Sequence, residues 1–236
     1  HSHLPHPGPD LRSELGPHRG GLADGARGTG RVREKRGGKL YTFVYGNPCA
    51  VNIDPIEKKP FYHFLPGTLA LSLATAGCNL RCQYCQNYSI SQHPPEETQN
   101  RDAPPEAVVA ASAQRGASTI AYTYSEPIIF YEYMLDTARL ARRYGLRNAV
   151  ISAGYINAEP LRELCRAVDA IKIDLKGYND DFYRTICGGT LAPVLEAIRT
   201  IHEMGVHLEI VNLVVPTLND DLSELRALTE WVLEAL

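Results

Sequence analysis

Three cysteines stand close together in the stretch Cys78-Asn-Leu-Arg-Cys82-Gln-Tyr-Cys85. An odd number of thiols in one short loop cannot all pair as disulfides, whereas thiolates are common ligands of zinc and of iron–sulfur clusters. A closed zinc site or an ordinary electron-transfer cluster takes four protein ligands. Three cysteines therefore predict a metal centre with one open position, which is typical of catalysis. For the isolated triad, zinc with a further ligand such as His93 is the alternative.

The triad follows the first of five apolar runs that alternate with helical patterns. The expected strands are 69–77, 118–124, 147–154, 169–177 and 206–216, and the expected helices are 104–116, 127–145, 158–168, 192–205 and 220–236. Such alternation predicts an α/β fold with a parallel sheet and right-handed crossovers. An open doubly wound sheet and a full or partial TIM-type barrel both satisfy the pattern. In either fold, ligands gather at the carboxyl ends of the strands.

The second expected strand ends in Thr123-Tyr124-Ser125-Glu126-Pro127. One interpretation is a helix start, with Ser125 or Glu126 near the N-cap and Pro127 in the first turn. The other is that Glu126 faces the cysteine loop and accepts hydrogen bonds from a cationic group such as an ammonium. The two interpretations are compatible.

The fourth expected strand carries Lys172, Asp174 and Lys176 at alternate positions, which places all three on one face. Buried charges are costly without partners, so an internal ion pair is one explanation. The other is that Asp174 and Lys176 bind the hydroxyls and carboxylate of a ligand. Ser152, at the end of the third strand, is a weak signal by itself, and Asn212 and Asn219 are expected to make turns and caps.

The segments before the first of these strands differ in composition. Residues 1–39 are rich in Gly, Pro and Arg without an apolar period, which predicts loop or partly disordered chain. Residues 40–68 are expected to form a small appended hairpin around Gly46-Asn47-Pro48, followed by a lead-in. Residues 69–236 then form the main domain.

The composition of the 236 residues is that of an ordinary soluble protein, with a net charge of −3. No run approaches the roughly 18 apolar residues of a membrane span, and the charge balance does not favour nucleic acid. Six cysteines without a secretory leader fit a reducing cytoplasm. Cys165 and Cys187 are expected to be small core or loop residues.

The Cys-x3-Cys-x2-Cys spacing, with Tyr84 before the last cysteine and an apolar strand before the first, resembles that of the radical S-adenosylmethionine (SAM) enzymes. This resemblance implies that Cys78, Cys82 and Cys85 bind three irons of a [4Fe-4S] cluster, and that SAM binds the fourth iron through its amino and carboxylate groups. It also implies reductive cleavage of SAM to a 5′-deoxyadenosyl radical that abstracts hydrogen from an unknown substrate.

Longer stretches are similar to the radical SAM member of the AmmeMemoRadiSam system, a relative of the pyruvate formate-lyase activating enzymes. They are VREKRGGKLY, IDPIEKKPFYHFLPG, AGCNLRCQYCQN, AYTYSEPIIFYEY and IKIDLKGYNDDFYR. By this resemblance, Ser125 and Glu126 belong to the motif that receives the SAM amino group, and Ser152, Asp174 and Lys176 lie where SAM is contacted. The resemblance further implies a reductant such as flavodoxin or ferredoxin, and a protein substrate or a partner within the system.

Three departures from the family pattern stand out. The cysteines of the usual front motif are replaced by Ser13, Gly16, Gly20 and Gly30, so no auxiliary metal site is expected there. Ala153 stands where relatives often have Asn. The partial barrel of the family has six β–α units, whereas only five are present here, which suggests a truncated chain.

Two further functions compete with a radical SAM enzyme of unknown substrate. Within the same class, the chain could be an activase that makes a glycyl radical on a partner enzyme. From another class, it could be a zinc-stabilised interaction module without catalysis, and a degenerate, truncated enzyme lies between the two.

Overall fold

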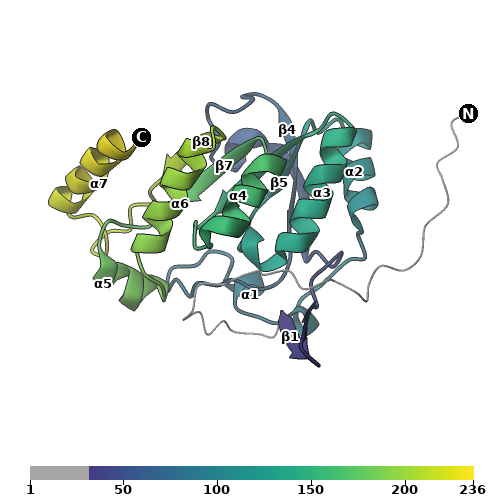
Figure 1. Cartoon of the computed structure of the whole chain (residues 1–236), viewed down its shortest axis with the longest axis horizontal. Helices are drawn as coiled ribbons and strands as arrows, with labels where there is room; N and C mark the ends of the chain where they lie inside the picture. Colours follow the sequence, from purple (N-terminus) through teal and green to yellow (C-terminus); the bar gives the residue numbers. More distant parts are fainter. Residues whose placement is uncertain (1–31) are drawn as a thin grey trace, which may run out of the picture.

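The computed structural model describes residues 32–236 and shows a layered α/β architecture (Figure 1). The expectations for residues 1–31, including the positions Ser13, Gly16, Gly20 and Gly30, lie outside the described residues. Within residues 32–236, no helix combines the length and apolarity needed to cross a bilayer.

One sheet of six strands organises the described chain, in the order β3-β4-β5-β6-β7-β8. Five neighbouring strands are parallel, as the alternating pattern predicted, and β3 is antiparallel to β4. The strands are β3 (Ala50–Pro55), β4 (Leu69–Ala74), β5 (Thr119–Tyr122), β6 (Arg147–Ser152), β7 (Ala170–Asp174) and β8 (His207–Val211). The two edge strands do not pair with each other within residues 32–236, so the sheet is an open, partial TIM-type barrel.

Helices follow each parallel strand, and Figure 1 shows α2, α3, α4 and α6 in a layer over one face of the sheet. The main helices are α2 (Pro105–Gln114), α3 (Tyr131–Arg143), α4 (Ala158–Ala167), α6 (Ala192–Glu203) and α7 (Leu222–Ala235). Shorter pieces are α1 (Tyr88–Ser91), α5 (Asp180–Phe182), the 3₁₀ turns η1 (Ile56–Lys58), η2 (Pro95–Glu97) and η3 (Pro127–Phe130), and the π-helical turn η4 (Tyr183–Cys187). All five predicted β–α units are thus confirmed.

The two faces of the sheet carry side chains of different size. Large apolar residues such as Leu73, Tyr122 and Ile171 are buried in the main core together with helix residues such as Met134 and Ile198. The other face carries mainly small residues, together with the larger Ile151 and Lys172. The small residues are Ala70, Ser72, Ala121, Ala149 and Ala170.

The loop between β3 and β4 covers this second face from the amino ends of the strands. Phe61 is fully buried with Ile56 among the alanines, and its ring lies 5.8 Å from that of Phe64. At the far edge strand, the Glu209 carboxylate accepts hydrogen bonds from the backbone N–H groups of Tyr62 and His63 at 2.9 and 3.0 Å. The loop therefore connects the two edges of the open sheet.

The predicted hairpin around Gly46-Asn47-Pro48 is wrong. The hairpin in the structure joins β1 (Arg33–Arg36) to β2 (Lys39–Thr42), with register Arg36↔Lys39. The apolar run at 50–55 pairs instead with β4, so it belongs to the main sheet. Alternating residues predict a strand, but they do not say which strand it pairs with. The main sheet therefore includes residues of the segment 40–68 as well as of 69–236.

Candidate active site at the carboxyl ends of the strands

The cysteine loop begins at Gly77, three residues after β4 ends. Gly77 has φ +100°, and a Cβ atom there would lie only 2.7 Å from Cγ1 of Val32. Its N–H donates to the carbonyl of Ile90 at 2.8 Å, which ties the start of the loop to α1. A glycine is required here because the backbone is left-handed and Val32, the residue before β1, packs against it.

Backbone hydrogen bonds hold the middle of the loop against η4. The Arg81 N–H donates to the Cys187 carbonyl at 2.8 Å, and the Gln83 N–H donates to the Ile186 carbonyl at 3.0 Å. The Asn79 amide donates to the Tyr155 carbonyl at 2.8 Å. The loop is therefore fixed by the protein itself on both sides of Cys82.

All three cysteines of the triad are free thiols and are half-buried. The Cys78 Sγ accepts a hydrogen bond from the Leu80 N–H at 3.4 Å, and the Cys85 Sγ lies 3.2 Å from the Ser91 hydroxyl. Within residues 32–236, no three His, Cys, Asp or Glu side chains converge on a single metal ion. Three soft thiol donors on one loop, one of them already receiving an amide N–H, fit a [4Fe-4S] cluster.

The thiols differ in acidity because their surroundings differ. A hydrogen bond from Cys187, helped by the Lys176 ammonium, lowers the pKa of Cys82 to about 7. Burial, with the Glu126 carboxylate nearby, raises the pKa of Cys78 to about 12. Burial alone would lower the pKa of Lys176, but the Cys82 thiol and the Asp174 carboxylate outweigh it, and that pKa is raised. A cation thus lies among the thiols.

Glu126 is buried at the start of η3, with 2% of its surface exposed. Its carboxylate accepts hydrogen bonds from the Ser152 hydroxyl at 2.7 Å, the Ala153 N–H at 2.9 Å and the Ile128 N–H at 3.3 Å. The last of these is the predicted N-cap contact, which is confirmed. Burial raises the pKa of Glu126 above its usual value in spite of the three donors.

The neighbouring residues of the same turn connect it to the cysteine loop. The Ser125 hydroxyl donates to the Thr75 carbonyl at 2.7 Å, directly beyond β4. The Asn87 amide donates to the Tyr124 carbonyl at 2.7 Å, shortly after Cys85. The structure therefore brings the two predicted motifs side by side.

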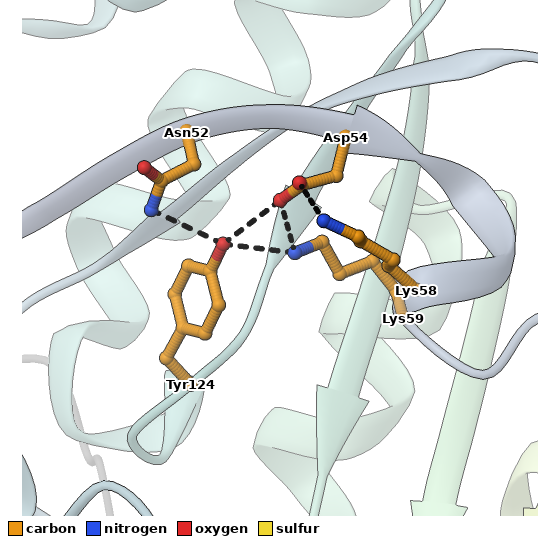
Figure 2. Close-up of polar contacts among 5 residues, drawn as sticks. All are labelled: Asn52, Asp54, Lys58, Lys59 and Tyr124. Atoms are coloured by element: carbon orange, nitrogen blue, oxygen red, sulfur yellow. Dashed lines mark hydrogen bonds and ion pairs between the residues drawn. The ribbon is translucent and has the colours of Figure 1, made fainter.

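Tyr124 is itself in the left-handed region, with φ +66°, which is uncommon for a non-glycine residue. Figure 2 shows its hydroxyl pointing into a polar cluster, where it accepts from Lys59 Nζ at 2.8 Å and from the Asn52 amide at 3.3 Å. The same hydroxyl lies 3.3 Å from Asp54, which pairs with Lys58 and Lys59 at 3.0 Å. The ion pairs to Lys58 and Lys59 lower the pKa of Asp54. The cluster ties the turn to β3.

The charged residues predicted on one face of β7 have two different roles in the structure. Lys172 is 3% exposed and forms a close ion pair with Asp174, as expected for an internal pair. The strand ends at Asp174, two residues earlier than needed to include Lys176. Lys176 follows the strand, its N–H donates to the Tyr183 hydroxyl at 3.1 Å, and its ammonium lies near the thiols.

Asn219 makes the expected turn contact, since its Oδ1 accepts from the Val215 N–H at 2.6 Å, whereas Asn212 makes a long-range contact in place of a turn or cap. The Asn212 amide donates to the Leu175 carbonyl at 2.7 Å, and the Asn219 amide donates to the Lys176 carbonyl at 2.7 Å. These contacts fix the backbone on either side of Lys176. The sequence did not indicate this support, nor the involvement of Lys59 or Cys187, because each contact joins residues far apart in the chain.

The comparisons with known proteins agree with this geometry. The model of the Radical SAM superfamily matches residues 72–229. MJ0808, an uncharacterized protein of Methanocaldococcus jannaschii, is 43% identical over 226 residues, which cover 96% of this chain and 67% of that protein. The pyruvate formate-lyase-activating enzyme of Clostridium pasteurianum is 25% identical over 166 residues, 66% of each chain.

Solved structures show the same fold at low sequence identity. Streptococcus suis SuiB bound to the precursor peptide SuiA has a TM-score of 0.56 at 13% identity, with 76% of this chain and 39% of that chain covered. A radical SAM methyltransferase from Sphaerobacter thermophilus has a TM-score of 0.53 at 18% identity, covering 73% and 54%.

The chain spans about two thirds of the length of the curated relatives it matches. The named relatives include enzymes, and the matched region contains every strand of the parallel sheet except the first residues of β4. On this match and on the cysteine loop at the end of its first parallel strand, the chain belongs to the radical SAM superfamily.

Proposed function

We propose that this protein is a radical SAM enzyme whose Cys78, Cys82 and Cys85 hold a [4Fe-4S] cluster. The observation that carries the proposal is the position of the three thiols, on the loop at the carboxyl end of β4 and beside the turn that holds Glu126, to which Asn87 and Thr75 connect it by hydrogen bonds. When bound, the cluster would supply the electron that cleaves SAM to methionine and a 5′-deoxyadenosyl radical, which abstracts hydrogen from a substrate.

Glu126 is the proposed acceptor for the SAM amino group. An ionised carboxylate offers about four acceptor sites, and three are filled by Ser152, Ala153 and Ile128. One remains for an ammonium donor. Because the protein supplies no cation within ion-pair distance among residues 32–236, a positive ligand group would relieve the cost of burying this charge.

Ser125, Ser152, Asp174 and Lys176 complete the proposed SAM site. Ser125 would position the turn, because its hydroxyl donates to the Thr75 backbone carbonyl. Ser152 would position Glu126, because its hydroxyl donates to the Glu126 carboxylate. The Asp174 carboxylate is partly open and would accept from ribose hydroxyls. The Lys176 ammonium would bind a carboxylate. These assignments rest on the family resemblance together with the positions of the four residues.

The substrate is proposed only by class. The similarity to pyruvate formate-lyase-activating enzymes favours a protein substrate, with the glycyl-radical activase as the specific candidate. A small reductant protein such as flavodoxin or ferredoxin would supply electrons. Membership of the AmmeMemoRadiSam group and a reducing, cytoplasmic location belong to the same proposal, and the free cysteines of the triad are consistent with that compartment.

Anaerobic reconstitution with iron and sulfide tests the function. We expect a brown protein with four irons per chain by the cluster stoichiometry, which releases 5′-deoxyadenosine when dithionite and SAM are added. A colourless protein holding stoichiometric zinc would instead identify an interaction module. A brown protein that releases no 5′-deoxyadenosine would identify a degenerate enzyme.

A further inference from the structure

A groove lies between α3 and α4, which Figure 1 shows side by side in the helix layer. The groove has a volume of about 530 Å³ and is lined by Arg139, Arg142, Glu159, Glu163, Arg166 and Ala167. A smaller hollow of about 190 Å³ continues from Arg142 to Arg147 and Asp169. Neither has a role in the proposed reaction.

The arginines around this groove outnumber the carboxylates. Arg143 lies one turn from Arg139 on α3, and Arg162 lies one turn from Arg166 on α4, so both share a helix face with a residue of the groove. We call the whole set the arginine groove, and its charged members are Arg139, Arg142, Arg143, Arg147, Arg162 and Arg166 with Glu159, Glu163 and Asp169. Six positive charges thus stand against three negative ones, although the net charge of the whole chain is −3.

The protein already uses two of the three carboxylates. Glu163 pairs with Arg139 at 2.8 Å and also accepts a hydrogen bond from the Tyr131 hydroxyl at 3.3 Å. Asp169 pairs with Arg147 at 3.0 Å. These two ion pairs join α3 to α4 and β6 to the start of β7. The other four arginines share the groove with a single further carboxylate.

These four arginines have hydrogen-bond donors available. The Arg142 guanidinium donates to the Arg166 backbone carbonyl at 2.6 Å, which is a neutral partner. Arg143, Arg162 and Arg166 are exposed and form no ion pair within residues 32–236. Cations are favoured in the last turn of a helix, which accounts for Arg142, Arg143 and Arg166 but not for Arg162, in the middle of α4. Each guanidinium offers five N–H donors in a fixed fork.

Carboxylates are the groups that these arginines suit. An arginine fork binds a carboxylate through two parallel hydrogen bonds. Tyr144, directly after Arg143, has 64% of its surface exposed, and Arg and Tyr are both enriched in protein–protein interfaces. The carboxylates of the groove would lie against the continuous row of phosphates of a nucleic acid, which disfavours that ligand. An acidic stretch of protein fits the groove better.

We propose that the arginine groove is a docking surface for an acidic segment of a partner protein. The smaller hollow reaches Arg147, the first residue of β6, and therefore the amino ends of the strands. The cysteine loop instead follows the carboxyl end of β4. The acidic segment thus binds apart from the reacting groups and holds the partner on the enzyme. This docking does not require a bound cluster.

Fluorescence anisotropy with a fluorescein-labelled oligoglutamate peptide tests the proposal on the purified chain, with and without reconstitution. The groove variant combines Arg143→Ser, Arg162→Ser and Arg166→Ser, which removes three exposed guanidinium groups without breaking an internal ion pair. It should bind the peptide about tenfold more weakly than the wild type, because three charge-assisted contacts are lost.

The matched control combines Arg101→Ser, Arg115→Ser and Arg226→Ser. These three arginines are also exposed but lie outside the groove, so the net charge changes by the same amount. This variant should bind the peptide as the wild type does.

Equal losses in the two triple variants would overturn the proposal, because binding would then follow net charge alone. A wild-type chain that does not bind the peptide would overturn it as well. A labelled single-stranded RNA that binds more tightly than the peptide at the same salt concentration, and loses affinity in the groove variant, would assign the groove to nucleic acid instead. If the groove variant does not fold, Arg162→Glu is measured in its place, with Arg226→Glu as its control. A chain that assembles no cluster or cleaves no SAM would count against the proposed function alone, because peptide binding remains measurable.

Discussion

Two carboxylates, the buried Glu126 and the partly buried Glu209, have similar hydrogen-bond partners and pKa shifts of opposite direction. Each accepts three hydrogen bonds: Glu126 from Ser152, Ala153 and Ile128, and Glu209 from Tyr62, His63 and the His207 ring. Burial raises the pKa of Glu126. Burial would also raise that of Glu209, but the hydrogen bonds from Tyr62, His207 and His63 outweigh it, and the pKa is lowered.

This difference in pKa shift distinguishes Glu209, a carboxylate with a structural role, from Glu126, a carboxylate suited to binding a ligand. The Glu209 side chain is 10% exposed, and two backbone N–H groups and the His207 ring satisfy its oxygens. Glu126 is more deeply buried and has no cation within ion-pair distance among the described residues. A buried carboxylate without an ion-pair partner among residues 32–236, at the carboxyl ends of parallel strands, suits a cationic ligand.

The largest expected effect concerns SAM affinity. Glu126→Gln should weaken SAM binding by about 2 kcal/mol, roughly 30-fold, because a hydrogen bond to a charged group is lost. The reconstituted cluster should stay intact. Isothermal titration calorimetry measures the affinity, and Glu209→Gln is the control that should bind SAM as the wild type does. Equal affinities in the two variants would leave Glu126 only as a helix cap.

The second effect concerns stability. Glu209→Ala removes the acceptor for two backbone N–H groups and should lower the free energy of unfolding by about 1–2 kcal/mol, since those donors can partly rehydrate. Urea denaturation of the cluster-free protein measures this loss. A variant as stable as the wild type would show that the loop between β3 and β4 does not depend on β8.

The pH dependence of stability should differ in sign between the two sites. The lowered pKa of Glu209 gives stability that is present above the unfolded value of about 4.3 and is lost as the pH falls through the folded pKa. The raised pKa of Glu126 gives stability that is lost as the pH rises through its folded pKa. Glu209→Gln should therefore flatten the acid side of the profile, and Glu126→Gln the side toward neutral pH. Urea midpoints measured from about pH 2 to about pH 8, which spans both pKa ranges, would contradict this if both variants changed the same side.

The smallest effect is expected at Tyr124. Tyr124→Phe loses the hydroxyl contacts to Lys59 and Asn52 and should cost about 1 kcal/mol of stability. Because the Glu126 partners are untouched, SAM affinity should remain close to wild type. Thermal denaturation and calorimetry on the same samples separate the two outcomes. A large loss of SAM affinity would place Tyr124 among the binding residues.

Much of the framework could be predicted from the sequence because it depends on local pattern. Apolar runs and intervening helices gave all five β–α units, and Pro127 indicated the cap at Glu126. The clustering of Cys78 with Glu126 followed from the rule that parallel strands present their carboxyl ends together.

The features that could not be predicted depend on contacts between residues far apart in the chain. The run at 50–55 signals a strand, but nothing local distinguishes β4 from a hairpin partner. In the sequence, Lys59 resembles an ordinary surface lysine. In the structure, its ammonium contacts Asp54 and Tyr124. Cys187 lies beside the cysteine loop because η4 folds back along it, and its carbonyl accepts from the Arg81 N–H.

The left-handed Tyr124 has a consequence for how the site meets its ligand. A non-glycine residue in this region costs about 1–2 kcal/mol, and the contacts of its hydroxyl and carbonyl hold it there. A glycine would leave this turn many conformations in the free protein, whereas tyrosine restricts them. The conformational entropy of this turn is therefore lost when the protein folds and not when a ligand binds. Ser125 and Glu126 are consequently preorganised for the ligand.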